Sequence, residues 1–553
     1  MTNSQLDQII VSAISTGKLW DASELDRADV SGITLSSSFE KRKNAIIRKY
    51  SSASHSSSIG KSMAIAAAVA VFILSLGVIT VVAVEPLRES AYNFIFEWVL
   101  PATEEPTEEP TEAITETESE PKLTETETKP TPQTPPPGVE YSTGLVFSLS
   151  DDGSYYTVTD VGSCTDNAVY IPPMHMEIPV MVIGKSAFKR SRAENIFVPE
   201  GVKIIEDSAF EDCSAVYIQL PETLEYIGDM AFFSCDKIET ISLGDNVHHI
   251  GYSAFISCSS LKSVTLKSLT KIESSTFAYC DSLEKIAIPD SVTVIESNAF
   301  GNCRSLKKIT LGSSLTKIGD NAFSGCEKLT SVQFPSSLQN VGSGAFIHCN
   351  SLSDISLNDG LRSIGDGAFG YCKISEITLP DSVEFLGANA FADCSRLRTV
   401  VMSEGIISIE EGTFRNCYNL ESITLSSNTE RIGANAFEGC SDLKEIALPS
   451  KLKIVEQLAF NDCCSLESIS FPDGVESLGN DFFNACANLK EITIGRGVKS
   501  IGTFIPENSP KLTTIKFRGT KEEWEAIAFA SIDSFAQITI IFESEDACTE
   551  AVE

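Results

Sequence analysis

The stretch CDSLEKIAIPDSVTVIESNAF, residues 280–300, contains the pattern that decides the fold. Apolar side chains at Leu283, Ile286 and Ile288 predict a short strand with one buried face. Pro289 ends this strand, because proline offers no donor to a hydrogen-bonded ladder. The stretch therefore begins with a strand only a few residues long.

A second apolar row follows in the same stretch. Val292 and Ile295 predict another inward-facing segment after the proline. The chain then turns back at Ala299 and Phe300, where the small Ala permits close packing of neighbouring coils and the Phe fills the space between layers. Together these residues predict one coil with two inward rows and a buried Phe at its turn.

The dipeptide Ala-Phe, or a close variant of it, recurs along the chain in steps of 22 or 23 residues. The phenylalanines concerned are Phe188, Phe210, Phe232, Phe255, Phe277, Phe300, Phe323, Phe346, Phe369, Phe391, Phe414, Phe437, Phe460 and Phe483. A constant period over most of a chain indicates one unit stacked many times, each unable to bury its apolar side without its neighbours. The sequence therefore predicts a mainly β repeat solenoid over residues 183–514.

The pair Ile-Gly precedes many of these turns, as at Gly319 and Gly433. Glutamate occupies the same place in other copies: Glu206, Glu273, Glu296, Glu410 and Glu456. Because a strict requirement for left-handed backbone would exclude Glu, we expect ordinary dihedral angles at this corner. We expect Gly to be there because of crowding or ease of turning.

Thirteen of the 16 cysteines lie three positions after these phenylalanines, from Cys213 to Cys486. Stacked coils bring equivalent Cα atoms to about 5 Å, within the range of a disulfide, but equivalent side chains point in parallel. We therefore expect a buried ladder of thiols in preference to systematic bridges. Zinc is disfavoured because one ligand per layer forms a line and not a tetrahedron. Cys464, Cys164 and Cys548 lie outside the ladder and stay unassigned.

Composition limits the possible functions. The 553 residues carry a formal net charge of −34, which excludes a generic nucleic-acid binder, because such proteins need clustered Lys and Arg. Hydrophobic residues make up 42% of the chain, enough to bury a large core, so the acidity belongs to the surface of a folded protein.

Residues 63–84 form an uninterrupted, uncharged apolar run of 22 residues, about 33 Å as a helix, which matches the hydrocarbon core of a bilayer. We expect an uncleaved transmembrane helix. A cleavable signal peptide is the alternative, but it normally has a short basic start, whereas about 60 residues precede this run. Lys and Arg cluster before the run, between Lys41 and Lys61, and Arg88 is almost alone after it. This asymmetry predicts a single-pass plasma-membrane protein with a cytoplasmic N-terminus and an extracellular solenoid.

The segments around this run differ in character. Residues 1–62 contain short amphipathic patterns, which fit either a solvated tail or a helical element that folds on a cytoplasmic partner. Residues 85–100 carry Tyr92 and Trp98, residue types that favour the water–lipid boundary and predict an interfacial helix. Residues 101–138 are almost entirely Pro, Thr and Glu, which predicts a disordered stalk that holds the solenoid away from the membrane.

The pattern L-x-x-I-x-L-P-x-S-V-x-x-I-G-x-x-A-F-x-x-C resembles the BspA-like leucine-rich repeats of bacterial surface proteins, over residues 140–530 with the flanks included. The segments at 139–182 and 515–553 resemble the caps of such arrays, the first β-rich and the second a closing segment with a tail. At the second cap, Thr520 and Glu523 predict a capping box, with Trp524 as the apolar cover of the last coil. The resemblance implies adhesion, or host and matrix binding, at the cell surface.

A second resemblance covers residues 36–100, where SSFEKRKNAIIRKY, the apolar run and VEPLRESAYNFIFEW look like the membrane segments of anti-sigma-type regulators of clostridia-like bacteria. It implies an alternative function, a transmembrane signalling regulator whose cytoplasmic segment binds a sigma factor and whose solenoid is the extracellular sensor. The segment lacks a zinc-binding His and Cys pair, so the zinc-containing version of these regulators is disfavoured.

No motif of a hydrolase, a kinase, a P-loop enzyme or a metalloprotease is present in the sequence, so we expect neither enzyme activity nor a cofactor. Binding is better supported, because one side chain of each strand points outward between the inward ones. We predict that this row contacts an extracellular protein or glycan over a long, shallow surface. An equal alternative is that small β-forming residues are there for sheet propensity and solubility alone. The predicted binding residues are Thr265, Thr310, Gln333, Ser356, Thr378, Val401 and Thr424.

Overall fold

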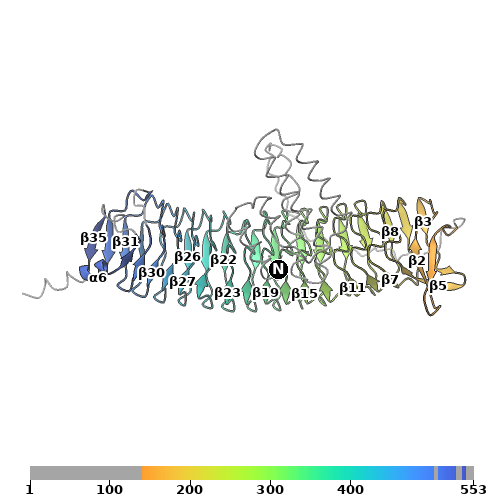
Figure 1. Ribbon diagram of the computed structural model, residues 1–553, viewed down its shortest axis with the longest axis horizontal. Helices are drawn as coiled ribbons and strands as arrows, with labels where there is room; N and C mark the ends of the chain where they lie inside the picture. The colour runs from red at the N-terminus through yellow and green to blue at the C-terminus, as the bar shows by residue number, and fades with distance from the viewer. Residues whose placement is uncertain (1–139, 504–507, 531–537, 544–553) are drawn as a thin grey trace, which may run out of the picture. The chain divides into compact units, whose positions relative to one another are not determined.

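The computed structural model describes residues 140–503, 508–530 and 538–543. Most coils contribute two short strands, and most strands pair in parallel with the equivalent strand of the next coil (Figure 1). The predicted cytoplasmic segment 1–62, transmembrane helix 63–84, interfacial helix 85–100 and stalk 101–138 lie outside the described residues. Within those residues, no helix is both long and apolar enough to cross a membrane.

The first strands of the coils form one side of the solenoid, which we call the first-strand face. Most have a buried central residue with more exposed neighbours on both sides, as in β14, where Ile286 is 4% exposed. Its strands are β3 (Ala168–Tyr170), β6 (Asn195–Phe197), β8 (Tyr217–Gln219), β10 (Thr240–Ser242), β12 (Ser263–Thr265), β14 (Lys285–Ala287), β16 (Lys308–Thr310), β18 (Ser331–Gln333), β20 (Asp354–Ser356), β22 (Glu376–Thr378), β24 (Thr399–Val401), β26 (Ser422–Thr424), β29 (Ser468–Ser470), β31 (Glu491–Ile494), β33 (Thr514–Phe517) and β35 (Thr539–Phe542). The coil between β26 and β29 passes this face without a strand, although Ile446 is buried there as well.

The second strands form the other side, the second-strand face, and most of them are two residues long. They are β5 (Ile178–Ile183), β7 (Ile204–Ile205), β9 (Tyr226–Ile227), β11 (His249–Ile250), β13 (Lys271–Ile272), β15 (Val294–Ile295), β17 (Lys317–Ile318), β19 (Asn340–Val341), β21 (Ser363–Ile364), β23 (Phe385–Leu386), β25 (Ser408–Ile409), β27 (Arg431–Ile432), β28 (Ile454–Val455), β30 (Ser477–Leu478), β32 (Ser500–Ile501) and β34 (Ala528–Phe529). Val292 and Ile295 are fully buried, as predicted for the second inward row.

The repeated phenylalanines form a column of nearly parallel rings through the interior. From Phe188 to Phe460, neighbouring ring centroids lie 4.9–6.0 Å apart, with interplanar angles of at most 15°. The backbone supports the same stacking, because Phe300 N donates to the carbonyl of Ala322 in the next coil at 2.7 Å. Burying one such side chain stabilises the fold by about 1.5–3 kcal/mol. The predicted role of Phe between layers is confirmed.

The cysteine ladder is also confirmed as a set of free thiols. Every cysteine in the described ranges is unbridged, and the ladder members from Cys213 to Cys486 are buried. From Cys235 onward each thiol donates to the carbonyl of the Phe in the preceding coil, with Sγ–O distances of 3.0–3.4 Å. Cys213 instead faces Cys235, with their sulfurs 3.3 Å apart. The thiols therefore satisfy backbone acceptors and do not cross-link the coils.

Both ends of the described array depart from the repeat. At the first end, β1 (Val146–Leu149) and β2 (Tyr156–Asp160) form an antiparallel hairpin, and β4 (Met174–His175) pairs antiparallel with β5. At the other end, α6 (Lys521–Glu525) begins with the predicted capping box between Thr520 and Glu523. Trp524 is 6% exposed and packs against Phe517, so the predicted apolar cover is confirmed.

Candidate functional site

The predicted binding residues lie in one line on the first-strand face. Each occupies the last position of its three-residue strand and is exposed: Thr265, Thr310, Gln333, Ser356, Thr378, Val401 and Thr424. The ladder register places several of them directly opposite one another, for example Gln333 opposite Ser356. The fold therefore brings residues more than 150 positions apart in the chain into one continuous row.

The surroundings of this row are polar but nearly balanced in charge. Exposed ion pairs precede the strands, such as Lys262–Glu239 at 2.8 Å and Lys307–Glu284 at 3.2 Å. Exposed pairs of this kind contribute little to stability, but they neutralise each other's charge. The row itself offers hydroxyl and amide groups, which can hydrogen-bond a ligand without burying a charge.

The described residues include a surface hollow but no metal-binding cluster of side chains. In the described part of the chain, no group of three or more His, Cys, Asp and Glu side chains is placed to hold a metal ion. A hollow of about 440 Å³ lies against the β1–β2 hairpin, open to solvent and lined by Ser150, Asp152 and Tyr155 among others. Hydrogen bonds from Ser154 and Ser150 lower the pKa of Asp152 to about 2, so this carboxylate stays ionised and supports the hairpin turn.

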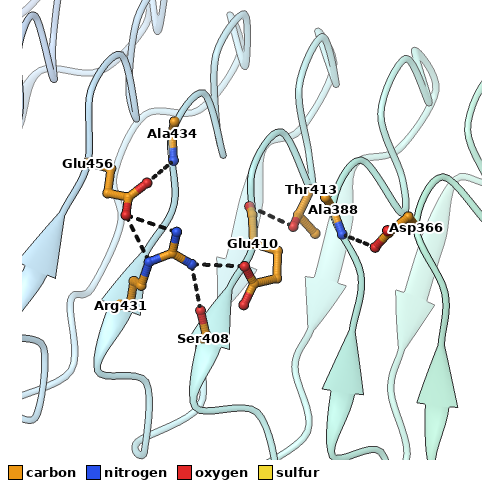
Figure 2. Close-up of polar contacts among 8 residues, drawn as sticks. All are labelled: Asp366, Ala388, Ser408, Glu410, Thr413, Arg431, Ala434 and Glu456. Atoms are coloured by element: carbon orange, nitrogen blue, oxygen red, sulfur yellow. Dashed lines mark hydrogen bonds and ion pairs between the residues drawn. The ribbon is translucent and has the colours of Figure 1, made fainter. Parts of the chain in front are cut away.

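The corner after each second strand contains polar contacts that the sequence reasoning missed. Arg431 on β27 donates to Glu410 in the preceding coil and to Glu456 in the next, at 2.9 Å in both cases (Figure 2). It also donates to Ser408 Oγ at 3.1 Å. Although partial burial opposes the charged form, the hydrogen bonds with these carboxylates raise the pKa of Arg431. Three successive coils are thereby joined through one guanidinium group.

The same corner caps backbone N–H groups in two ways. Where Gly is followed by an acidic residue, the carboxylate accepts from the next coil, as Asp366 accepts from Ala388 N at 2.9 Å (Figure 2). Where Glu replaces Gly, the carboxylate reaches back, as Glu456 accepts from Ala434 N in the preceding coil at 3.1 Å. Glu206 accepts from Lys185 N in the same backward direction. Glu206 and Glu456 are therefore capping groups, a role that the repeat pattern alone did not reveal.

The presence of Glu in other copies predicted ordinary backbone angles at this corner. This prediction is confirmed, because Gly319 and Gly433 do not have a positive φ. A Cβ added to Gly319 would lie 2.7 Å from backbone of Glu296, so crowding is the operative reason for glycine. In the coils, residues with left-handed backbone lie instead two positions before and two positions after each of the repeated phenylalanines, as at Asn298 (φ 56°) and Asn302 (φ 57°). Their sequence signal was the frequent Asn, Asp, Ser and Gly at these positions, because Asn, Asp and Gly tolerate left-handed backbone best.

The predicted row extends further toward the N-terminal end of the solenoid than the sequence reasoning placed it. Tyr170 and Phe197 occupy the same last strand position in β3 and β6. The sequence contained a signal for their position, because each of the two is followed by an apolar residue and a proline. Ala287 is followed in the same way by Ile288 and Pro289. The outer row therefore changes from aromatic to small polar residues along the array.

Comparisons with known proteins agree with this architecture. The family described as BspA type leucine rich repeat region matches in six copies, over residues 181–287, 270–398 and 407–536. No curated protein sequence matches the chain. Among solved structures, a leucine-rich repeat protein from Bacteroides ovatus is 22% identical, covering 72% of this chain and 98% of its own, with a TM-score of 0.47.

Two further solved structures are similar to a comparable extent. A leucine rich cell surface protein from Faecalibacterium prausnitzii is 24% identical, covers 72% of this chain and 99% of its own, and has a TM-score of 0.39. The pneumococcal vaccine antigen PcpA is 21% identical, covers 73% of this chain and 98% of its own, and has a TM-score of 0.33. Since the family match spans more than half of the residues, the chain belongs to the BspA-type leucine-rich-repeat family.

Proposed function

We propose that the chain is a membrane-anchored protein of the bacterial cell surface whose solenoid binds a protein or glycan ligand. The observation that carries this proposal is the exposed, uncharged row from Thr265 to Thr424 on the first-strand face. The interior behind it is filled by Phe, Leu and Ile, so a ligand contacts a long surface and does not enter a deep pocket. The solenoid is therefore a binding scaffold and not an enzyme.

The proposed anchor is the apolar run at 63–84, with the stalk at 101–138 between it and the solenoid. In this arrangement the solenoid lies outside the cell and the first 62 residues lie inside. Protease treatment of intact cells tests the orientation. The proposal predicts release of a soluble fragment containing the solenoid, whereas full protection of the solenoid would contradict it.

Binding is tested by adhesion of cells that display the full chain to immobilised matrix proteins and glycans. The proposal predicts that adhesion to at least one of these surfaces is lost when residues 140–543 are deleted and the anchor is kept. Membrane fractionation of both strains controls for equal insertion. Unchanged adhesion after the deletion would overturn the binding function.

The resemblance of residues 36–100 to anti-sigma-type regulators favours a second function, in which the cytoplasmic segment binds a sigma factor. Affinity capture with residues 1–62 as bait tests this alternative. Recovery of a sigma factor supports a signalling role in which the solenoid is the sensor. Recovery of no specific cytoplasmic protein contradicts signalling and leaves the adhesion proposal unaffected.

A further inference from the structure

Three aromatic residues, Tyr170, Phe197 and Tyr217, lie on β3, β6 and β8 at the N-terminal end of the first-strand face, where Figure 1 labels β3 and β8. The rings of Tyr170 and Phe197 are stacked with centroids 4.3 Å apart and an interplanar angle of 1°. Tyr217 meets Phe197 at 6.0 Å and 60°. We call these three residues the aromatic platform.

The aromatic platform faces outward and is held by backbone bonds. Val169, Ile196 and Ile218 are the buried centres of the same strands, so the flanking side chains point away from the core. Tyr217 is 43% exposed. Ser142 also fixes Tyr170 from the side, because Ser142 N donates to the Tyr170 carbonyl at 2.9 Å and its Oγ accepts from Tyr170 N at 3.1 Å. A surface fixed in this way loses little entropy when it binds a ligand.

The aromatic platform continues directly into uncharged polar residues. In the ladder register Tyr170 lies opposite Phe197, and Phe197 lies opposite Gln219. Ser242 and Thr265 occupy the equivalent positions in the following coils, paired in the same way. Stacked rings are therefore followed, along one line, by an amide and two hydroxyl groups.

We propose that the aromatic platform, together with Gln219, Ser242 and Thr265, binds a neutral oligosaccharide. This inference rests on the proposed function, names a ligand class for it and extends the binding surface to the coils that precede Thr265. A sugar ring has apolar C–H faces, which pack on aromatic rings, and equatorial hydroxyls, which bond to amide and hydroxyl groups. A row that combines both kinds of group is suited to a chain of sugar units lying along the coils.

Charge does not favour anionic glycans at this site. The chain has a net charge of −34, and the exposed Glu194 lies beside the platform, where it accepts from Asn167 Nδ2 at 2.9 Å. The platform residues themselves carry no charge that would attract a sulfated or uronic-acid chain. Like charges on ligand and protein therefore oppose the binding of a polyanion.

The experiment is isothermal titration calorimetry of the full-length chain in lipid nanodiscs. The neutral probes are hexasaccharides of glucose, mannose and galactose, and a heparin-derived hexasaccharide and a proline-rich peptide serve as the anionic and polypeptide probes. We expect at least one neutral hexasaccharide to bind. Replacing the exposed ring by Tyr217→Ala weakens that binding by about tenfold or more, whereas Tyr217→Phe changes it by less than about threefold, because it keeps the ring.

The matched control is Tyr418→Ala, since Tyr418 is 46% exposed but lies in the turn before β26. We expect no change in binding from this substitution. Absence of binding by every neutral probe, binding of only the heparin or peptide probe, or equal binding by Tyr217→Ala would each overturn the inference. Cell adhesion that persists in Tyr217→Ala would then leave the broader binding function standing, so the two proposals fail separately.

Discussion

Two lines of residues run along the same coils. The inner column consists of the buried Phe and Cys of the coils, and the outer row consists of the last residue of each three-residue strand on the first-strand face. They differ in how much the residue type varies from coil to coil. The inner column repeats Phe and Cys from coil to coil, with rings 4.9–6.0 Å apart and thiols bonded to the Phe carbonyls of the preceding coil. The outer row changes from Tyr170 and Phe197 to hydroxyl and amide side chains. Each inner residue contacts its own equivalents above and below, so any change there disturbs two interfaces. Most side chains of the outer row are exposed to solvent and tolerate more variation, which fits the proposal that they specify a ligand.

The largest expected effect acts on the whole inner column at once and comes from alkaline pH. Burial raises the pKa of Cys349 and of Cys394 from 9.0 to about 12. Because the folded-state pKa exceeds the unfolded one, the neutral thiols stabilise the fold fully below pH 9, and this contribution is lost as pH rises toward 12. Each titrating thiol lowers the free energy of unfolding by about 1.4 kcal/mol per pH unit in this range.

Urea unfolding under reducing conditions at pH 8 and pH 10 measures this loss. Lys and Tyr also titrate in this range, so the control is a variant with Cys303, Cys326 and Cys349 replaced by Ala. The urea midpoint of this variant should be lower than that of the parent chain at pH 8. Between pH 8 and pH 10, the urea midpoint of the variant should fall by less than that of the parent. An identical fall in both proteins would show that the ladder does not carry the pH dependence.

The second expected effect is the removal of one ring from the column. Phe323→Ala leaves a cavity between Phe300 and Phe346, whose rings lie 5.2 Å from that of Phe323 on either side. We expect a loss of about 3–5 kcal/mol in the free energy of unfolding, measured by urea denaturation. Thr310→Ala on the outer row serves as the comparison and should stay within about 0.5 kcal/mol of the parent. Similar losses in both variants would erase the distinction between column and row.

A third test distinguishes thiols inside and outside the ladder. Cys326→Ala removes a fully buried sulfur and its bond to the Phe300 carbonyl, and should cost about 1–2 kcal/mol. Cys464 is partly exposed and bonds to its neighbour Asp462, so Cys464→Ala should cost much less. Thermal unfolding of the two variants in parallel gives the difference. A larger loss for Cys464→Ala would contradict the packing role of the ladder.

The smallest expected effect concerns the corner. Arg431→Ala breaks bonds to Glu410 and Glu456 but leaves both carboxylates partly exposed to water. We expect a loss of about 0.5–1 kcal/mol that shrinks at high salt, because ion pairs at this exposure are screened. Urea midpoints at low and high ionic strength measure it. A loss of several kcal/mol that does not change with salt would show that the corner belongs energetically to the interior.

The difference between the inner column and the outer row also explains which features could be predicted from the sequence. Phe, Cys and the strand centres repeat with a fixed period, so their burial in stacked coils follows from the period alone. The forward cap from Asp366 to Ala388 N and the backward cap from Glu456 to Ala434 N each join residues 22 positions apart. Such bonds depend on how neighbouring coils are placed, and residue types within one copy do not reveal their direction. The aromatic start of the outer row had a visible signal, in the proline that follows each strand.

The most direct test of the account places two charges on the outer row and measures both stability and adhesion. The first double variant, Thr310→Lys with Ser356→Lys, places two lysines on the first-strand face, two coils apart. The matched control, Thr293→Lys with Gln339→Lys, places two lysines at the same spacing beside the second-strand face. We predict unchanged urea midpoints in both double variants, and loss of cell adhesion only in the first. Full adhesion by a folded Thr310→Lys/Ser356→Lys protein would contradict the assignment of ligand binding to the outer row.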